Sequence, residues 1–173
     1  TLYIAILGFV VSVLLARQLG VESFGNYSYI LSLAGILFII QDGGYRALLY
    51  RQNVDGSSQE LISKAIGYLL IVTLIICLFL LFVQPDNWLT ILVAILCMSL
   101  VAVCGFISSL LNGLGNFKLD ALWKIIIRSG TALFILGALF FYKGVTAMTI
   151  FLGWGFALLI VLIWPLSKGW LAW

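Results

Sequence analysis

Apolar residues in this chain come in long blocks that short polar segments separate. About 20 apolar residues, at 1.5 Å per residue, form a helix that crosses roughly 30 Å of hydrocarbon. Long unbroken blocks exclude the alternating polarity of β-barrel strands. We therefore predict an all-α membrane protein, a polytopic bundle of about six transmembrane helices at residues 2–19, 27–49, 61–83, 88–111, 121–142 and 147–167.

The segments between the blocks contain residues that end helices or turn the chain. Gly20 is suited to the left-handed conformation that closes a helix, and Pro85 cannot continue helical hydrogen bonding. Gly113 and Gly115 offer a turn between the fourth and fifth blocks. The longest polar segment, residues 51–60, separates the second block from the third.

The composition agrees with a membrane protein. Hydrophobic residues make up 64% of the chain and charged residues 9%, with a mean hydropathy of +1.24, whereas soluble domains average about 45–50% apolar and 25% charged residues. The chain has no histidine, which excludes imidazole catalysis and histidine metal ligands. It also lacks a P-loop and a paired-cysteine motif. We therefore expect no catalytic residue, no metal, no cofactor and no nucleic-acid partner.

The basic residues favour a cytoplasmic N-terminus. With this orientation, seven of them fall on the cytoplasmic side and two on the outer side, as the positive-inside rule requires. The seven are Arg46, Arg51, Lys64, Lys118, Lys124, Arg128 and Lys168, and the two are Arg17 and Lys143. The chain begins inside an apolar block and ends without a polar tail, so we expect it to be part of a longer protein.

Two charged residues within the second predicted span are expected to pair. Asp42 and Arg46 are four residues apart, so they share one helical face in the acid-before-base order that favours an ion pair. Counted from Leu49, they lie about 10 Å and 5 Å inside the cytoplasmic end of the span. Charges at such depth face protein or water rather than lipid. The pair either joins this helix to a neighbour or lines a transport pathway.

The first and fifth predicted spans also contain charged residues. Arg17 lies near the outer end of the first span, where it either snorkels to the headgroups or points into a central cavity. Asp120, Lys124 and Arg128 form one stripe on the fifth span, which either snorkels at the cytoplasmic flank or lines a cavity. A guanidinium at the depth of Arg128 can donate two parallel hydrogen bonds to a phosphate. The candidate substrate-binding residues are therefore Arg17, Asp42, Arg46, Lys124 and Arg128.

Two stretches resemble a known family of membrane transporters. Residues 14–51, LLARQLGVESFGNYSYILSLAGILFIIQDGGYRALLYR, are similar to the first two helices of the Wzx-type polysaccharide biosynthesis flippases. These flippases belong to the multidrug/oligosaccharidyl-lipid/polysaccharide exporter superfamily. Residues 110–122, LLNGLGNFKLDAL, are similar to the family's turn between helices four and five, and Val21 departs from the proline frequent there. The matching residues in the first stretch are Ala16, Arg17, Leu19, Gly20, Phe24, Gly25, Tyr27, Ser32, Asp42 and Gly44.

The resemblance implies a fold and a function that composition alone does not. Members have twelve to fourteen transmembrane helices in two six-helix lobes around a central cavity. They move undecaprenyl-diphosphate-linked oligosaccharides, such as O-antigen or capsule repeat units, from the inner to the outer leaflet of the bacterial inner membrane. Residues 1–173 would then be the N-terminal lobe of such a transporter.

The resemblance also implies partners and one site residue. Lipid-linked oligosaccharide and membrane lipids are the expected partners, and a coupling ion and a polysaccharide polymerase are left open. Arg17 matches an arginine of the family's first helix, and the basic residues of the family's cavity are thought to meet the lipid diphosphate. Arg46 and Arg128 have no such match, and only their depth in the predicted spans makes them candidates.

Two alternative functions remain open. A cation-coupled drug or metabolite exporter of the same superfamily would depend on acids such as Asp42. An intramembrane enzyme would need Asp42 and Asp120 as an aspartyl pair, although Asp120 begins a predicted helix.

Overall fold

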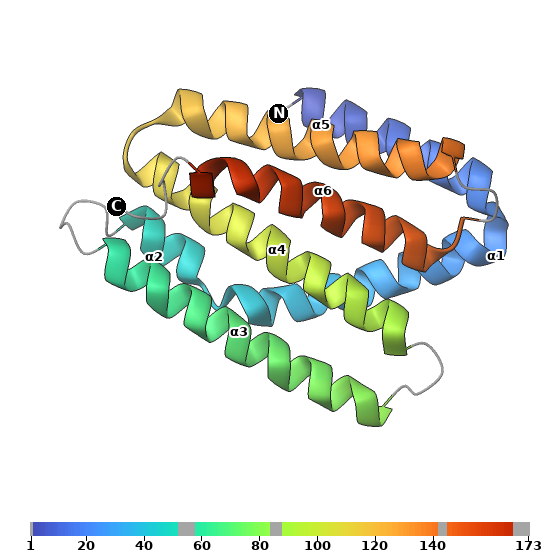
Figure 1. The fold of residues 1–173 in the computed structure, drawn as a ribbon, viewed down its shortest axis with the longest axis horizontal. Helices are drawn as coiled ribbons and strands as arrows, with labels where there is room; N and C mark the ends of the chain where they lie inside the picture. The colour runs from blue at the N-terminus through green and yellow to red at the C-terminus, as the bar shows by residue number, and fades with distance from the viewer. Residues whose placement is uncertain (1, 52–57, 84–87, 142–144, 168–173) are drawn as a thin grey trace.

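The computed structural model describes residues 2–51, 58–83, 88–141 and 145–167, which form six α-helices and no strand. An all-α bundle, as predicted, is confirmed. The helices are α1 (Leu2–Asp42), α2 (Tyr45–Arg51), α3 (Ser58–Val83), α4 (Trp88–Gly113), α5 (Phe117–Phe141) and α6 (Ala147–Ser167), as Figure 1 shows.

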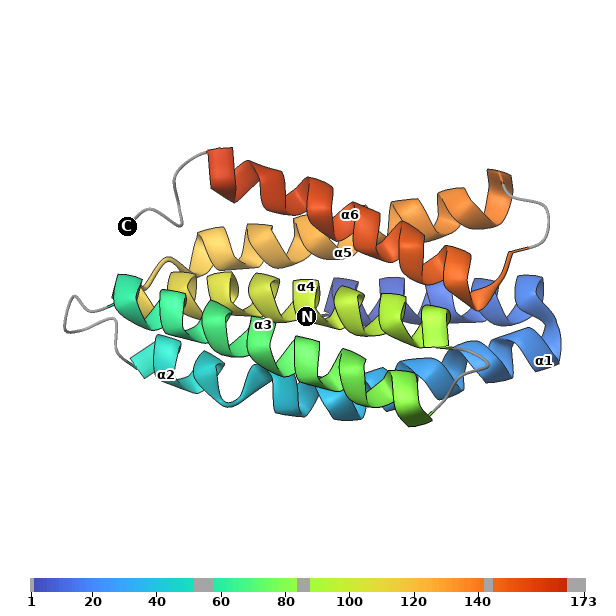
Figure 2. The ribbon, with the colours of Figure 1, turned by 60° about the horizontal axis from the view of Figure 1, so that its bottom comes forward.

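Most of the described helices are long and apolar enough to cross a membrane. They are α1, the Glu60–Leu80 part of α3, α4 and the Phe117–Phe140 part of α5, while Ala147–Ile163 of α6 is a shorter apolar helix. The 41 residues of α1 would measure about 60 Å as a straight helix, twice the thickness of the hydrocarbon. Instead, α1 turns back at Gly20 and returns along the bundle (Figures 1 and 2). The first arm of α1 therefore corresponds to the predicted span 2–19, and the second arm together with α2 corresponds to the span 27–49.

The helix α4 lies at the centre of the bundle and contacts each of the other five described helices. Small residues such as Ala94, Ala102 and Gly105 let its neighbours approach closely. Three apolar clusters fill the interfaces around it. The first joins α4 to α1, α3, α5 and α6, the second joins it to α2 and α3, and the third joins it to α5 and α6.

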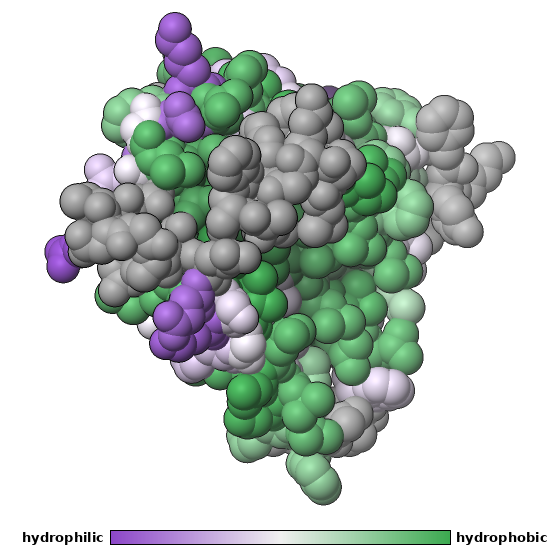
Figure 3. Space-filling model, turned by 60° about the vertical axis from the view of Figure 1, so that its left-hand side comes forward, coloured by the Kyte–Doolittle hydropathy of each residue, from purple (hydrophilic) through white to green (hydrophobic). Residues whose placement is uncertain are grey.

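The outer surface is mostly apolar. Large hydrophobic side chains such as Leu70, Leu74 and Phe79 on α3 are exposed, which suits contact with lipid chains rather than water. Figure 3 brings forward the end of the molecule at which α2 ends and α3 begins, and hydrophilic side chains gather there on an otherwise hydrophobic surface. Polar residues are therefore concentrated at a helix end, as in a membrane-spanning bundle.

The helix boundaries differ from the prediction in the second span. The span was expected to run as one helix over residues 27–49, but α1 ends at Asp42 and α2 begins at Tyr45. The break occurs because Gly43 and Gly44 have φ angles of 53° and 76°, which a continuing helix does not allow. Gly20 (φ 73°) and Gly115 (φ 74°) do turn the chain as predicted. Residues 52–57 of the predicted polar segment 51–60, the predicted break at 84–87, Lys143 and Lys168 lie outside the described residues.

Candidate functional site

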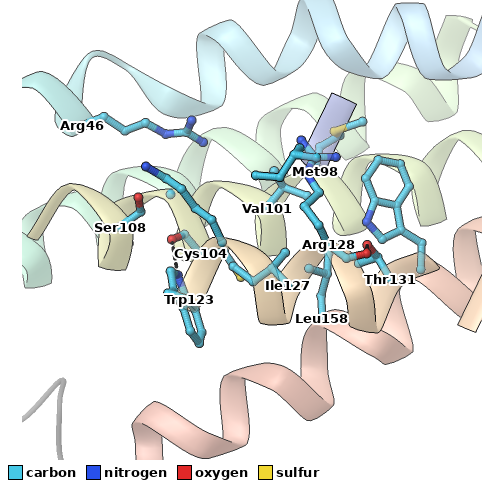
Figure 4. Close-up of a pocket in the computed structure, with 14 residues that line it drawn as sticks. Arg46, Met98, Val101, Cys104, Ser108, Trp123, Ile127, Arg128, Thr131 and Leu158 are labelled. Atoms are coloured by element: carbon cyan, nitrogen blue, oxygen red, sulfur yellow. Dashed lines mark hydrogen bonds between the residues drawn. The ribbon is translucent and has the colours of Figure 1, made fainter. Parts of the chain in front are cut away.

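A cavity of about 420 Å³ lies between the first arm of α1, α2 and the facing surfaces of α4, α5 and α6. Three of the five candidate residues line it: Arg46 on α2, and Lys124 and Arg128 on α5. Figure 4 shows Arg46 extending into this space from α2 and Arg128 rising toward it from α5. Sequence separation between these two arginines is large, so the bundle itself brings the cations together.

The break between α1 and α2 directs Arg46 toward the cavity. Tyr68 of α3 donates a hydrogen bond to the carbonyl of Ile40 at 3.0 Å, which satisfies an acceptor near the end of α1. The same tyrosine ring packs on Gly43, where a Cβ atom would lie 2.8 Å from Tyr68 Cζ. A larger residue at this glycine would therefore displace Tyr68. The glycine pair and the tyrosine together set where α2 begins.

Arg46 lies among an acid, an aromatic ring and a glycine. Its Nε atom is 2.6 Å from Asp42 Oδ1, its Cζ atom is 4.8 Å from the centre of the Phe38 ring, and its guanidinium lies against Gly105 of α4. The predicted ion pair is confirmed, but it spans the glycine break instead of one continuous helical face. Arg46 Nη2 is buried and makes no hydrogen bond to the described residues. This unused donor lies against α4 beside Gly105.

Lys124 is neutralised by a buried carboxylate. Its Nζ atom donates to Asp120 Oδ2 at 2.6 Å, and the Ser108 hydroxyl of α4 donates to Asp120 Oδ1. Asp120 is only 5% exposed, whereas the side chain of Lys124 is 47% exposed. Two partners thus hold the carboxylate in place while Lys124 reaches the cavity. For Lys124 the sequence left open whether it snorkels at the cytoplasmic flank or lines a cavity, and the structure places it in the cavity wall with an ion pair to Asp120.

Arg128 differs from the other two cations because its charge is unbalanced. Within the described part of the chain, no carboxylate or other acceptor lies within bonding distance of its guanidinium. It also lines a second cavity of about 170 Å³ between the two arms of α1, α5 and α6. Thr131 and Trp154 line both cavities as well. Arg128 therefore stands at the border of two adjoining spaces.

The other two candidate residues do not line either cavity. Asp42 reaches the larger cavity only through its contact with Arg46. Arg17 lies in the first arm of α1, three residues before the turn at Gly20, and its side chain is exposed. The structure therefore brings together Arg46, Lys124 and Arg128, and it leaves Arg17 apart from them.

Several residues of the cavity were not predicted from the sequence. The wall on α4 contains Val101, Cys104, Gly105 and Ser108, which recur at helical spacing on one face. Behind it, the fully buried Trp123 donates its indole N–H to the carbonyl of Cys104 at 3.1 Å, as Figure 4 shows. A run of small residues on α4 is the sequence signal that could have indicated this wall.

The fold and the site define a multi-pass helical membrane protein with a cationic cavity inside its bundle. Residues 1–170 match the family described as polysaccharide biosynthesis protein, and the chain belongs to this family. The resemblance found in residues 14–51 and 110–122 is thereby confirmed. Comparisons with curated proteins and with solved structures gave no match. The family and the apolar helices together define a membrane protein of polysaccharide biosynthesis.

Proposed function

We propose that this chain is one lobe of a flippase for lipid-linked oligosaccharides. The substrate would be an undecaprenyl-diphosphate-linked repeat unit of O-antigen, capsule or exopolysaccharide, moved from the inner to the outer leaflet of the bacterial inner membrane. The chain would act without catalysing a reaction, with its N-terminus in the cytoplasm. This orientation is supported by the basic residues that precede and follow the helices at one end of the bundle.

The unbalanced charge of Arg128 is the observation that carries the proposal. The side chain of Arg128 is exposed on this lobe, yet it belongs to a helix apolar enough to span the membrane, where a cation without a partner is costly. Arg46 and Lys124 in the same cavity already have a partner. A diphosphate would supply the missing anion, and a guanidinium binds phosphate oxygens through two parallel hydrogen bonds. Arg46 lines the same cavity with a partly exposed side chain and adds positive charge there.

The cavity has a size that suits part of such a substrate. Small-molecule pockets measure about 300–1,000 Å³, and this cavity measures about 420 Å³. A diphosphate with an attached sugar fits this range, whereas the whole oligosaccharide would need the space between two lobes. A second lobe facing this one would enlarge the site and exclude lipid from it.

Transport then follows from simple energetics. A sugar diphosphate cannot cross hydrocarbon unaided because each polar group that loses its partners costs several kcal/mol. A polar cavity removes this barrier while the lipid tail stays in the bilayer. Rocking of two lobes would open the cavity to each side in turn. An inside-negative potential assists outward movement of anions by about 2.3 kcal/mol per charge at 100 mV.

The contacts of the two acids favour this function over the alternatives. An exporter of cationic drugs needs a free carboxylate, but Asp42 is bound to Arg46. An aspartyl enzyme needs two carboxylates that share a proton, but Asp120 is bound to Lys124 and Ser108 instead. Replacing Asp42 by Asn separates these functions, because an exporter would lose efflux whereas a flippase depends more strongly on Arg128.

The proposal is tested by complementing a deletion strain with variants of the full-length protein. Arg128→Ala should strand lipid-linked repeat units on the cytoplasmic side and lower surface polysaccharide about tenfold or more, because a charge-assisted hydrogen bond contributes about 1.5–3 kcal/mol. Arg128→Lys should restore part of the transport, since lysine keeps the charge but not the planar fork.

Lys118→Ala is the matched control. Lys118 also lies on α5, but its side chain is exposed and does not line the cavity. This variant should transport at the wild-type rate. Normal surface polysaccharide in the deletion strain itself, or in Arg128→Ala, would contradict the proposed function.

A further inference from the structure

The second cavity, of about 170 Å³, has two chemically different ends. At one end lie Arg128 and Thr131, which it shares with the cationic cavity. The rest of its wall is mostly apolar, with Ser12 and Tyr27 as its polar side chains, and comes from both arms of α1, from α5 and from Trp154 of α6. This wall includes Leu7, Val11, Leu15, Leu31 and Ile135. A cation at one end of an apolar groove suits an amphipathic anion.

We propose that this groove binds the first isoprene unit of a prenyl diphosphate whose diphosphate lies on Arg128. The inference rests on the proposed function and adds to it the place where the lipid chain leaves the cavity. By volume, the groove holds on the order of five non-hydrogen atoms, if each takes about the 30 Å³ of a water molecule. One isoprene unit has this size.

The width of the groove favours a methyl-branched chain. Gly8 lines it, and a Cβ atom placed on Gly8 would meet no other atom within 4 Å. The neighbouring Ser12 is also small and turns its hydroxyl to the carbonyl of Gly8 at 2.9 Å. The helix α1 thus leaves room beside α5 for a branch methyl, which a straight acyl chain would leave unfilled.

The prenyl chain is held in the groove mainly by its covalent link to the bound diphosphate, and only weakly by its own affinity for the groove. Moving a prenyl chain from lipid into a protein groove gains little hydrophobic energy, since both surroundings are apolar. Once the diphosphate is bound at Arg128, however, the attached isoprene unit is present at a high effective concentration at the groove. The groove therefore determines where the prenyl chain lies. An experiment that tests the groove must report the position of the prenyl chain rather than its affinity.

The test uses the full-length protein in lipid nanodiscs and a diphosphate whose first isoprene unit carries a diazirine. Photolysis should label residues 7–15 of α1 and 128–135 of α5, and inorganic diphosphate should compete with the labelling. Gly8→Leu should lower labelling of these residues about fivefold, because its side chain fills the groove. Gly35→Leu, on the other arm of α1, is the matched control and should label as the wild type does. Gly35 lines neither cavity and also has open space around it.

Three outcomes would overturn the inference. If inorganic diphosphate competes with binding but the labels fall on other parts of the protein, the inference is overturned and the proposed function stands. Unchanged labelling in Gly8→Leu would have the same meaning. Equal labelling of the groove by a phosphatidylglycerol with a diazirine in its acyl chain would make the groove an ordinary lipid contact. Absence of any diphosphate-competed binding to the wild-type protein would overturn the proposed function, and this inference with it.

Discussion

The guanidinium of Arg46 lies directly on the backbone of Gly105, so that a Cβ atom on this glycine would be 2.5 Å from Arg46 Nε. Glycine at this position of α4 is what allows the arginine of α2 to enter the cavity. The sequence indicated Arg46 as a candidate residue of the site, but it did not indicate Gly105.

Replacing Gly105 by alanine should displace Arg46 and leave the fold intact. The clash falls on the end of a flexible side chain, which can move away from α4. We expect transport to fall about tenfold, because a misplaced charged group loses its alignment with the substrate. Surface polysaccharide in a complemented deletion strain measures the effect, and the thermal unfolding midpoint should change little.

Gly67→Ala is the control for this substitution. Gly67 lies within α3, and a Cβ atom there would meet nothing within 4 Å. It should transport as the wild type does. Full transport by Gly105→Ala would show that the position of Arg46 does not matter.

The buried carboxylate of Asp120 gives a prediction about stability. Ser108→Ala removes one of its two hydrogen-bond donors and should destabilise the protein by about 1 kcal/mol. Asp120→Asn removes the charge that faces Lys124 and should cost up to about 3 kcal/mol. The double variant should cost less than the sum of the two, because the Ser108 hydroxyl donates to a charged carboxylate in the wild type but only to a neutral amide in Asp120→Asn, so less is lost when it is removed there. Chemical unfolding in detergent measures all three, and strict additivity would contradict the contact.

The sequence predicted the cations of the site better than it predicted the site's walls. The depth of Arg128 and the spacing of Lys124 and Asp120 are local properties of one helix, so periodicity and hydropathy revealed them. The spacing of Asp42 and Arg46 also indicated their ion pair, although the helix between them is broken. Local spacing carries this information whether or not the helix continues.

What the sequence could not predict depends on contacts between distant segments. Nothing near Gly43 indicates that Tyr68 of α3 packs on it, or that Arg46 rests on Gly105. Arg17 illustrates the opposite case, since a family match singled it out but the fold of this lobe places it away from both cavities. Which residues line a cavity depends on how the helices pack, and helix packing could not be predicted from one sequence.

A buried polar group joins three helices and should contribute to the stability of the bundle. The Gln41 amide of α1 donates to Thr73 of α3 at 3.1 Å and to Ser99 of α4 at 3.0 Å, and it is fully buried. Hydrogen bonds between membrane helices contribute about 0.6 kcal/mol each on average. Gln41→Leu should therefore destabilise the protein by about 1 kcal/mol and not much more, because the Thr73 and Ser99 hydroxyls also bond to each other at 3.0 Å. Unfolding in detergent tests this, and a more stable Gln41→Leu protein would contradict it.

The turn at Gly20 depends on a backbone conformation that other residues rarely adopt. Its φ of 73° and ψ of 172° lie in a region that is essentially restricted to glycine, and a side chain there costs about 1–3 kcal/mol. Gly20→Ala should therefore lower stability by this amount even though a Cβ atom would meet nothing within 4 Å. Gly25→Ala, in the helical second arm with equally open surroundings, should be neutral or slightly stabilising because alanine favours helix. The comparison isolates backbone strain from packing. Equal unfolding midpoints for the two variants would mean that the chain does not need a glycine conformation to reverse between the two arms of α1.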